Sequence, residues 1–199
     1  MPRNLKMIYV SAALDCVGWS VTAPVLPILY HKIGVSSSQV SQLAALMGFI
    51  SLLSAGLQGR LSDIYSKVGL LQVSTLSSLL TTVMLWLYAL DILRSWSLFV
   101  TVRAISSFFK MGMVVSQAFV VDYAHAIEVR EADSGKRATG FISTLMSASN
   151  MGFLAGPIIG GMLSQHASYP FLFSIVVLVL NIGSLQLVSD TVPVPVTPH

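Results

Sequence analysis

The chain has 199 residues, of which 54% are hydrophobic and 10% are charged, and its formal net charge is +3. Soluble domains usually carry about 25% charged residues, so the composition excludes a water-soluble globule of this size. The excess of basic residues does not indicate a nucleic-acid partner, because lysine and arginine in a membrane protein report topology.

The apolar residues occur in blocks of about 20, the length that a helix needs to cross ~30 Å of hydrocarbon. A signal peptide does not explain the first block, which is too long and precedes five more spans. We therefore expect a membrane-embedded bundle over 1–189 and a proline-rich cytoplasmic tail or linker over 190–199. The blocks predict six transmembrane helices, roughly 7–30, 39–60, 69–90, 96–122, 139–163 and 169–189.

The basic residues outside the spans are distributed unevenly between the two sets of connecting segments. With a cytoplasmic N-terminus, the inside segments hold seven of them and the outside loops hold two. The positive-inside rule then predicts that both termini are cytoplasmic. The inside residues are Arg3, Lys6, Arg60, Lys67, Arg130, Lys136 and Arg137, and the outside residues are Lys32 and Arg94.

The first span carries a carboxylate, Asp15, at a depth where hydrocarbon is expected. A charge there costs at least about 2.5–3.5 kcal/mol unless it meets a partner or water. It is followed by Gly18, Pro24 and Pro27. These residues leave backbone carbonyls without hydrogen-bond donors from the helix and allow the chain to bend. Asp15 therefore lines a water-filled cavity or belongs to a buried ion pair that only fixes helix packing. The one cysteine, Cys16, lies in the same span, so an internal disulfide is excluded.

The turn between the second and third spans contains the sequence GRLSDIYSK over residues 59–67. Taken alone, it is a polar turn at the membrane surface in which Asp63 and Lys67 are solvated.

The longest polar stretch, 123–138, predicts a solvated cytoplasmic connection between the fourth and fifth spans.

The fourth span holds two cations, Arg103 and Lys110. With Gln117 they are spaced by seven residues, which places all three on one face of a continuous helix. A polar stripe on an apolar helix most simply lines a water-filled cavity. Arg103 and Asp15 differ in depth by about 8 Å, a gap that an arginine side chain, water or a substrate could bridge. The alternatives are a structural ion pair and a Lys110 side chain that snorkels to the interface.

The fifth span has glycines spaced by four, a pattern that lets two helices approach closely. Pro157 within it predicts a kink. Helix packing alone accounts for the pattern, and the further hypothesis is that this packing controls which side of the membrane the cavity opens to. The residues are Gly152, Gly156, Pro157, Gly160 and Gly161.

Matches between the second and fifth spans indicate an internal repeat. Residues 47–50 (MGFI) recur as 151–154 (MGFL), and the Gly-x-Leu-Ser pattern of 59–62 recurs at 161–164. A three-plus-three inverted repeat requires this pairing of spans. We therefore predict an all-α membrane protein whose six transmembrane helices form such a repeat.

Four of these motifs, in order along the chain, resemble those of the major facilitator superfamily. Residues 59–67 resemble its loop motif G-x-L-a-D-r-x-G-r-k, although Ile64, Ser66 and Val68 depart from it. Arg103 with Gly112 is similar to its fourth-helix motif. The glycine pattern of the fifth span resembles the motif of drug:proton antiporters, and residues 14–27 are similar to the first helix of tetracycline-resistance-type antiporters and of some eukaryotic orphan transporters.

The resemblance implies a proton-coupled antiporter of small organic molecules and the amino-terminal half of its fold. Asp15 and Arg103 would be candidates for proton coupling, since a buried carboxylate beside a movable cation can titrate when a cavity opens. Asp63 would stabilise the outward-facing state at a helix N-terminus of the second half. Lys67 would link Asp63 to Asp122, with Gly59 in the same motif. The expected partners are the lipid bilayer, a small-molecule substrate, protons and a second six-helix half.

The resemblance covers one half of a family member, so three interpretations stay open. The sequence is a fragment of a longer protein, a short isoform, or a half-transporter that dimerises. A different class of function is a non-transporting six-helix protein that binds a partner half through its glycine-rich faces. No enzyme, metal site or cofactor is expected, because the sequence has no zinc-ligand spacing or nucleotide-binding loop.

Overall fold

The computed structural model describes residues 3–131 and 136–188. The predicted tail over 190–199 and part of the polar connection therefore lie outside the described residues. Within those residues the chain is helical throughout, with short connections and no strand. The helices are α1 (Arg3–Ser20), α2 (Leu26–Lys32), α3 (Ser37–Ile64), α4 (Lys67–Ala89), α5 (Trp96–Phe108), α6 (Gly112–Glu131), α7 (Lys136–Leu163) and α8 (Tyr169–Gln186).

Five stretches of these helices are long and apolar enough to cross a membrane. They are Ser37–Ile64, Lys67–Ala89, Trp96–Ala126, Ala138–Leu163 and Tyr169–Gln186. The first predicted span is divided between α1 and α2, and α1 carries Arg3, Lys6 and Asp15. These three charges keep α1 out of this set, although α1 has 18 residues like α8, so a sixth crossing remains a prediction.

The first and fourth predicted spans are both interrupted. The helix α1 ends at Ser20, and residues 21–25 form a turn before α2. Pro24 lies in this turn and Pro27 opens α2, in agreement with the predicted bend. The fourth predicted span, 96–122, matches a stretch, Trp96–Ala126, that is long and apolar enough to cross a membrane. The continuous helix assumed by the seven-residue spacing within it is wrong, because α5 ends at Phe108 and α6 begins at Gly112.

The interruption in the fourth span is held by polar side chains of two neighbouring helices. Gln58 of α3 donates its amide Nε2 to the Phe108 carbonyl over 3.0 Å. The Met111 backbone N–H donates to the Ser74 hydroxyl of α4 over 3.2 Å. Backbone groups freed by a break inside a membrane must find such partners, because lipid offers none. The break in the fourth span is thus stabilised by specific hydrogen bonds from α3 and α4.

Leucine in place of Gln58 is expected to lower the thermal stability of the protein in detergent. Gln58 is 4% exposed, and its loss leaves the Phe108 carbonyl without this donor at a cost of about 1–3 kcal/mol. The measurement is the unfolding temperature of the purified protein. Gln42→Leu is the matched control, because Gln42 is exposed on the same helix. Equal unfolding temperatures for the two variants would show that Gln58 does not stabilise the break.

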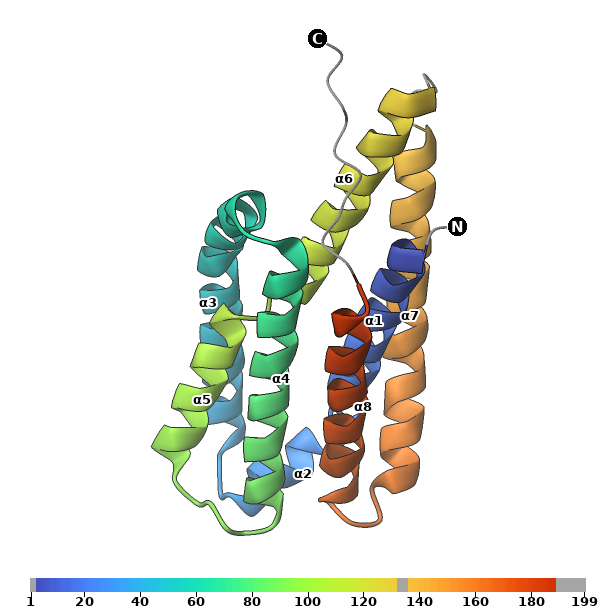
Figure 1. Cartoon of the computed structure of the whole chain (residues 1–199). Coiled ribbons are helices and arrows are strands. Elements are labelled where there is room, and N and C mark those ends of the chain that lie inside the picture. Colours follow the sequence, from blue (N-terminus) through green and yellow to red (C-terminus); the bar gives the residue numbers. More distant parts are fainter. Residues whose placement is uncertain (1–2, 132–135, 189–199) are drawn as a thin grey trace.

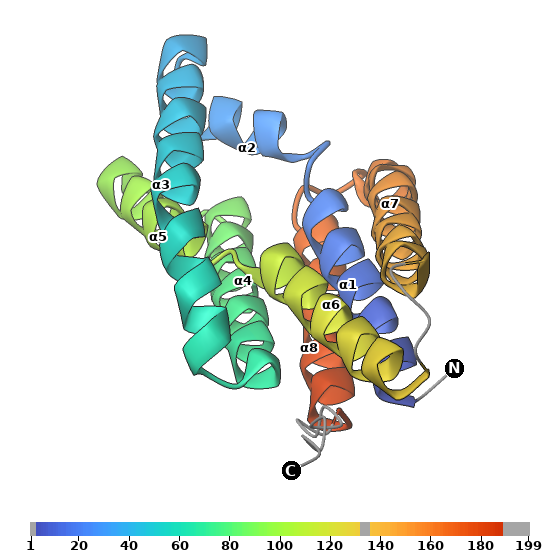
Figure 2. The same cartoon turned by 90° about the horizontal axis from the view of Figure 1, so that it is seen from above.

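The helices form two groups that α6 crosses (Figures 1 and 2). The helices α3, α4 and α5 lie together on one side, and α1, α7 and α8 on the other. The contact between α4 and α8 joins the groups. The N-terminus, the α3–α4 turn and the end of α6 lie at one end of the bundle, here called the terminus end (Figure 1). The connections after α2, α4 and α7 lie at the other, the loop end.

Two hydrophobic clusters form the core, one toward each end of the bundle. The terminus-end cluster includes Leu5, Ile8, Leu71, Val115 and Leu185, all nearly or fully buried. The loop-end cluster includes Val25, Leu29, Leu85 and Phe171, and it is closed by the aromatic rings of Tyr30, Tyr88, Trp96 and Phe99. Between the clusters, the helices carry serine, threonine and ionisable residues.

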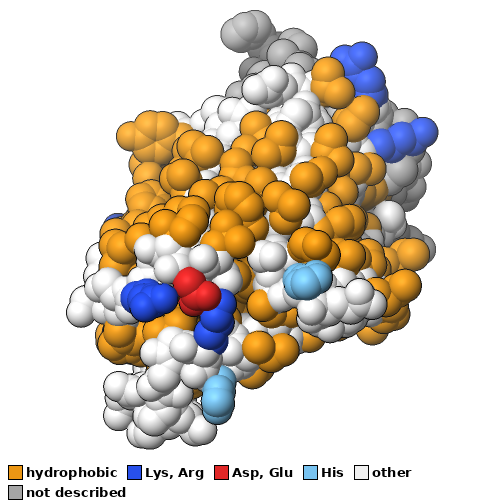
Figure 3. All heavy atoms as spheres, turned by 90° about the horizontal axis from the view of Figure 1, so that it is seen from below, with side chains coloured by type: hydrophobic (Ala, Val, Ile, Leu, Met, Phe, Trp, Pro, Cys, Tyr) orange, Lys and Arg blue, Asp and Glu red, His pale blue; other side chains and the backbone are white. Residues whose placement is uncertain are grey.

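The loop end presents hydrophobic side chains with a small group of charges among them (Figure 3). Lys32 and Asp91 form an ion pair there, with 2.7 Å between Nζ and Oδ2. Tryptophan and tyrosine at this end are typical of the boundary between hydrocarbon and headgroups. The polar layer that separates the two clusters therefore lies deep within the bundle.

Candidate functional site

Two pockets adjoin in the polar layer, and Asp15 lines both of them. The first, here called the Arg103 pocket, has a volume of about 450 Å³ including its open part and is lined by Asp15, Trp19, Thr22, Ser78, Thr81, Thr82, Leu85, Arg103, Ser106 and Leu178. The second, the Asn181 pocket, has about 310 Å³ measured in the same way and is lined by Ser11, Ala12, Asp15, Cys16, Leu71, Thr75, Gly112, Met113, Ser116 and Asn181.

The Asp15 carboxylate lies beside the start of α6. A side-chain carbon built on Gly112 would lie 3.3 Å from Asp15 Oδ2, so a larger residue would crowd the carboxylate. The absence of a side chain on Gly112 therefore lets Asp15 approach the N-terminal turn of α6. The unpaired backbone N–H groups of such a turn favour a nearby anion. The helix break thus provides an environment that offsets part of the cost of a buried carboxylate.

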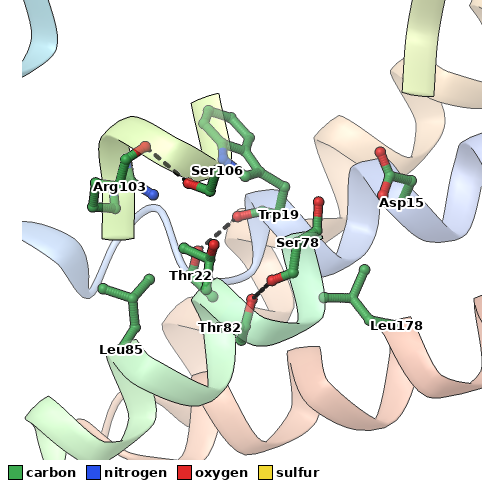
Figure 4. Close-up of a pocket in the computed structure, with 10 residues that line it drawn as sticks. Asp15, Trp19, Thr22, Ser78, Thr82, Leu85, Arg103, Ser106 and Leu178 are labelled. Carbon is green, nitrogen blue, oxygen red and sulfur yellow. Dashed lines mark hydrogen bonds between the residues drawn. The ribbon is translucent and has the colours of Figure 1, made fainter. Parts of the chain in front are cut away.

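Arg103 lines the same pocket as Asp15 but lies at its far side (Figure 4). Among the described residues the two form no ion pair. The Arg103 Nε atom is buried and has no hydrogen-bond partner in the described part of the chain. The pocket therefore separates a carboxylate from a guanidinium and keeps both available to a molecule between them.

Lys110 lies in the break between α5 and α6, close to the first-span residue Trp19. Its ammonium is 3.9 Å from the centre of the Trp19 ring, which is a cation–π contact. It also acts electrostatically on Asp15, although the described residues show no ion pair between them. Lys110 is exposed. Its position at the edge of the polar layer makes it a second cation near Asp15.

Gln117 does not join the other polar residues of the fourth span. Its Nε2 is 4.0 Å from the sulfur of Met146 on α7. The spacing of seven assumed a continuous helix, and the interruption at residues 109–111 changes the register between Arg103 and Gln117. The interruption removes the continuous helix on which the predicted stripe rested, and Gln117 lines neither of the two pockets.

The glycine motif of α7 packs directly on the end of α1. A side-chain carbon on Gly152 would lie 2.5 Å from the Ala13 carbonyl oxygen. One on Gly156 would overlap Ser20 Oγ, and one on Gly160 would overlap the Val21 carbonyl oxygen. Gly161, by contrast, has open space around it. Three of the four glycines are thus needed for the close approach of α7 to α1 and to the turn that follows it.

The loop motif at the terminus end is only partly connected. Lys67 Nζ lies 2.5 Å from Asp122 Oδ2, so the start of α4 is tied to α6. Asp63 is exposed and takes part in no ion pair among the described residues. Gly59 has open space around it. The structure therefore brings Lys67 and Asp122 together but leaves Asp63 outside this pair.

Sequence reasoning missed several residues that line the two pockets. Trp19, Thr75, Ser116 and Asn181 are examples. Asn181 could have been found, because it is a lone amide inside the apolar run 175–182 and such a residue needs a partner in the membrane. The hydroxyls give no comparable signal, since serine and threonine can donate to the preceding turn of their own helix, as Thr75 does to the Leu71 carbonyl.

Two comparisons with known proteins bear on this site. A sequence model of the Major Facilitator Superfamily matches residues 8–198 of the chain. The chain is also similar to the tetracycline resistance protein, class H, of Pasteurella multocida, with 25% identity over 87% of this chain and 41% of that protein. The chain thus spans less than half the length of this relative.

Proposed function

Because the chain belongs to the Major Facilitator Superfamily, we propose that it forms one wall of a transport pathway for small organic solutes, coupled to protons in the opposite direction. The family consists of membrane transporters rather than enzymes, and the chain is a multi-pass membrane protein. The observation that carries the proposal is that Asp15 lines both pockets of the polar layer. A carboxylate in that position can meet solute on one side and a proton route on the other.

The Arg103 pocket supplies the solute-binding part of the proposal. Its hydroxyls come from Thr22, Ser78, Thr81, Thr82 and Ser106, and Trp19 offers an aromatic surface. In this proposal the orphaned Arg103 Nε binds an acceptor group of the solute, and Lys110, which does not line this pocket but lies over the Trp19 ring, adds positive charge beside it. A proton carried by Asp15 and a solute held at Arg103 then compete for the same pocket, which is what antiport requires.

Alternating access is proposed to follow from a three-plus-three inverted repeat. The broken pair α1–α2 would correspond to the broken pair α5–α6, and α3 would correspond to α7, with 28 residues in each. Together with α1 and α2 as the first crossing, this gives six transmembrane segments. Both termini are proposed to be cytoplasmic, with Gly59, Asp63, Lys67 and Asp122 controlling one conformational state at that surface.

The second wall of the pathway is proposed to come from another six-helix half. The helix α3 leaves Phe49, Leu52, Leu53 and Leu57 exposed, and α7 leaves Met151, Leu154, Ile158 and Met162 exposed. These faces need lipid or protein around them. Transporters of this architecture hold solute between two such halves near the midplane.

The test of the proposed function is solute-driven proton movement across liposomes. The complete protein, as its own cell expresses it, is reconstituted with a pH-sensitive dye inside the vesicles. A panel of organic cations, anions and zwitterions is then added outside. We expect at least one compound to move protons in the direction opposite to its own gradient. If labelled compounds enter without any proton movement, antiport with protons is wrong.

A further inference from the structure

The Asn181 pocket lies on the terminus-end side of Asp15. Ser11 precedes Asp15 on α1, Thr75 lies in the first half of α4, and Ser116 and Asn181 lie on helices that run toward the terminus end. These four side chains come from four different helices and are each at most 4% exposed. Four polar groups therefore meet deep in the bundle around one hollow.

One of these groups has an unmet hydrogen bond. The Asn181 side chain is 0% exposed, and its Nδ2 has no partner among the described residues. Its Oδ1, by contrast, accepts from Ser184 Oγ over 3.4 Å. A buried amide N–H left without an acceptor costs about 1–3 kcal/mol. The hollow offers about 30 Å³ to the centre of a water molecule, which is more than the roughly 10–15 Å³ that one water molecule needs, so it has room for the missing acceptor.

The chemistry of the lining selects water over a cation. Asn181 Nδ2 donates, the hydroxyls both donate and accept, and Asp15 accepts. A sodium ion would place its positive charge against the amide N–H, whereas a water molecule accepts from that N–H and donates to the carboxylate. Among the residues that line this pocket, only Asp15 and Cys16 are ionisable.

We propose that the Asn181 pocket holds ordered water that carries protons between Asp15 and the terminus end, with Asn181 as its positioning residue. This inference rests on the proposed role of Asp15 in proton coupling. The terminus-end cluster, with Leu71 and Val115, closes the route beyond the pocket in this conformation. In this conformation the water is therefore enclosed beside Asp15. It connects to the solvent when the terminus end of the bundle opens.

The first test is an experimental structure of the complete protein at a resolution that shows water. We expect a water molecule within hydrogen-bond distance of Asn181 Nδ2, and no such water at this site in Asn181→Leu. An empty pocket, or one that holds sodium or a lipid chain, would overturn the inference. This readout is independent of transport, so it can stand even if the proposed function fails.

The second test is the rate of solute-driven proton movement in liposomes. Asn181→Leu is expected to lower the rate of proton movement roughly fivefold. The ratio of the rates in ordinary and deuterated water should also rise in this variant, because a proton-transfer step then limits the rate. Asn181→Ser, which keeps a group that binds water, should restore part of the rate. Asn150→Leu makes the same change at an exposed position of α7 and is the control. An unchanged isotope effect in Asn181→Leu would mean that Asn181 serves packing only.

Discussion

Asparagine in place of Asp15 is expected to abolish solute-driven proton movement while the protein stays folded. Asparagine has nearly the same shape but cannot carry a proton in exchange for solute. Removal of a charge from a membrane span relieves a burial cost of about 2.5–3.5 kcal/mol on insertion scales, so thermal stability should stay equal or rise. The measurements are proton movement in liposomes and the unfolding temperature in detergent.

Exchange of labelled solute for unlabelled solute separates coupling from binding in the same variant. Because Arg103 and the pocket hydroxyls remain, exchange without a proton gradient should persist in Asp15→Asn. Asp63→Asn is the matched control, since Asp63 is exposed and lies outside both pockets. Proton movement at the wild-type rate in Asp15→Asn would remove Asp15 from the coupling mechanism.

The second large effect is expected for alanine in place of Gly156. The added methyl group would overlap Ser20 Oγ and lie 2.8 Å from the Val21 backbone nitrogen. Overpacking in a core costs about 1–3 kcal/mol, and here two backbones must separate to relieve it. We therefore expect a lower unfolding temperature, a smaller monodisperse fraction after purification and loss of transport.

Gly161→Ala is the control for this change, because no atom lies within 4 Å of the added carbon. Alanine favours a helix over glycine by about 0.5–1 kcal/mol, so this variant should be as stable as the parent or slightly more so. If Gly156→Ala and Gly161→Ala behave alike, close packing of α7 on α1 is not what the motif provides.

Most helix positions could be predicted from the sequence because a membrane span leaves a strong signal of length and apolarity. The spans predicted over 39–60, 69–90, 139–163 and 169–189 each overlap a described helix almost completely. The bend after Asp15 could be predicted as well, since Pro24 and Pro27 limit what the backbone can do.

The break in the fourth span could not be predicted in the same way. No proline marks it, and it depends on Gln58 and Ser74, which are far from it in sequence. The placement of Asp15 and Arg103 in one pocket was within reach, because both are ionisable residues in spans. The separation of Gln117 from them was not, since it follows from the same break.

The close contact between α7 and α1 also constrains motion. Where backbones touch without side chains between them, as Gly152 touches Ala13, no flexible group can absorb a shift of one helix along the other. The two helices should therefore behave as one rigid lever. Gly160 extends this contact to Val21 and Pro24, so the turn at residues 21–25 is held against α7 as well, and a change of angle is expected between this turn and α2. Asp15 lies on α1 and would move with the two helices. The tilt of α1 and α7 would therefore change how far the Asp15 carboxylate is exposed to each pocket.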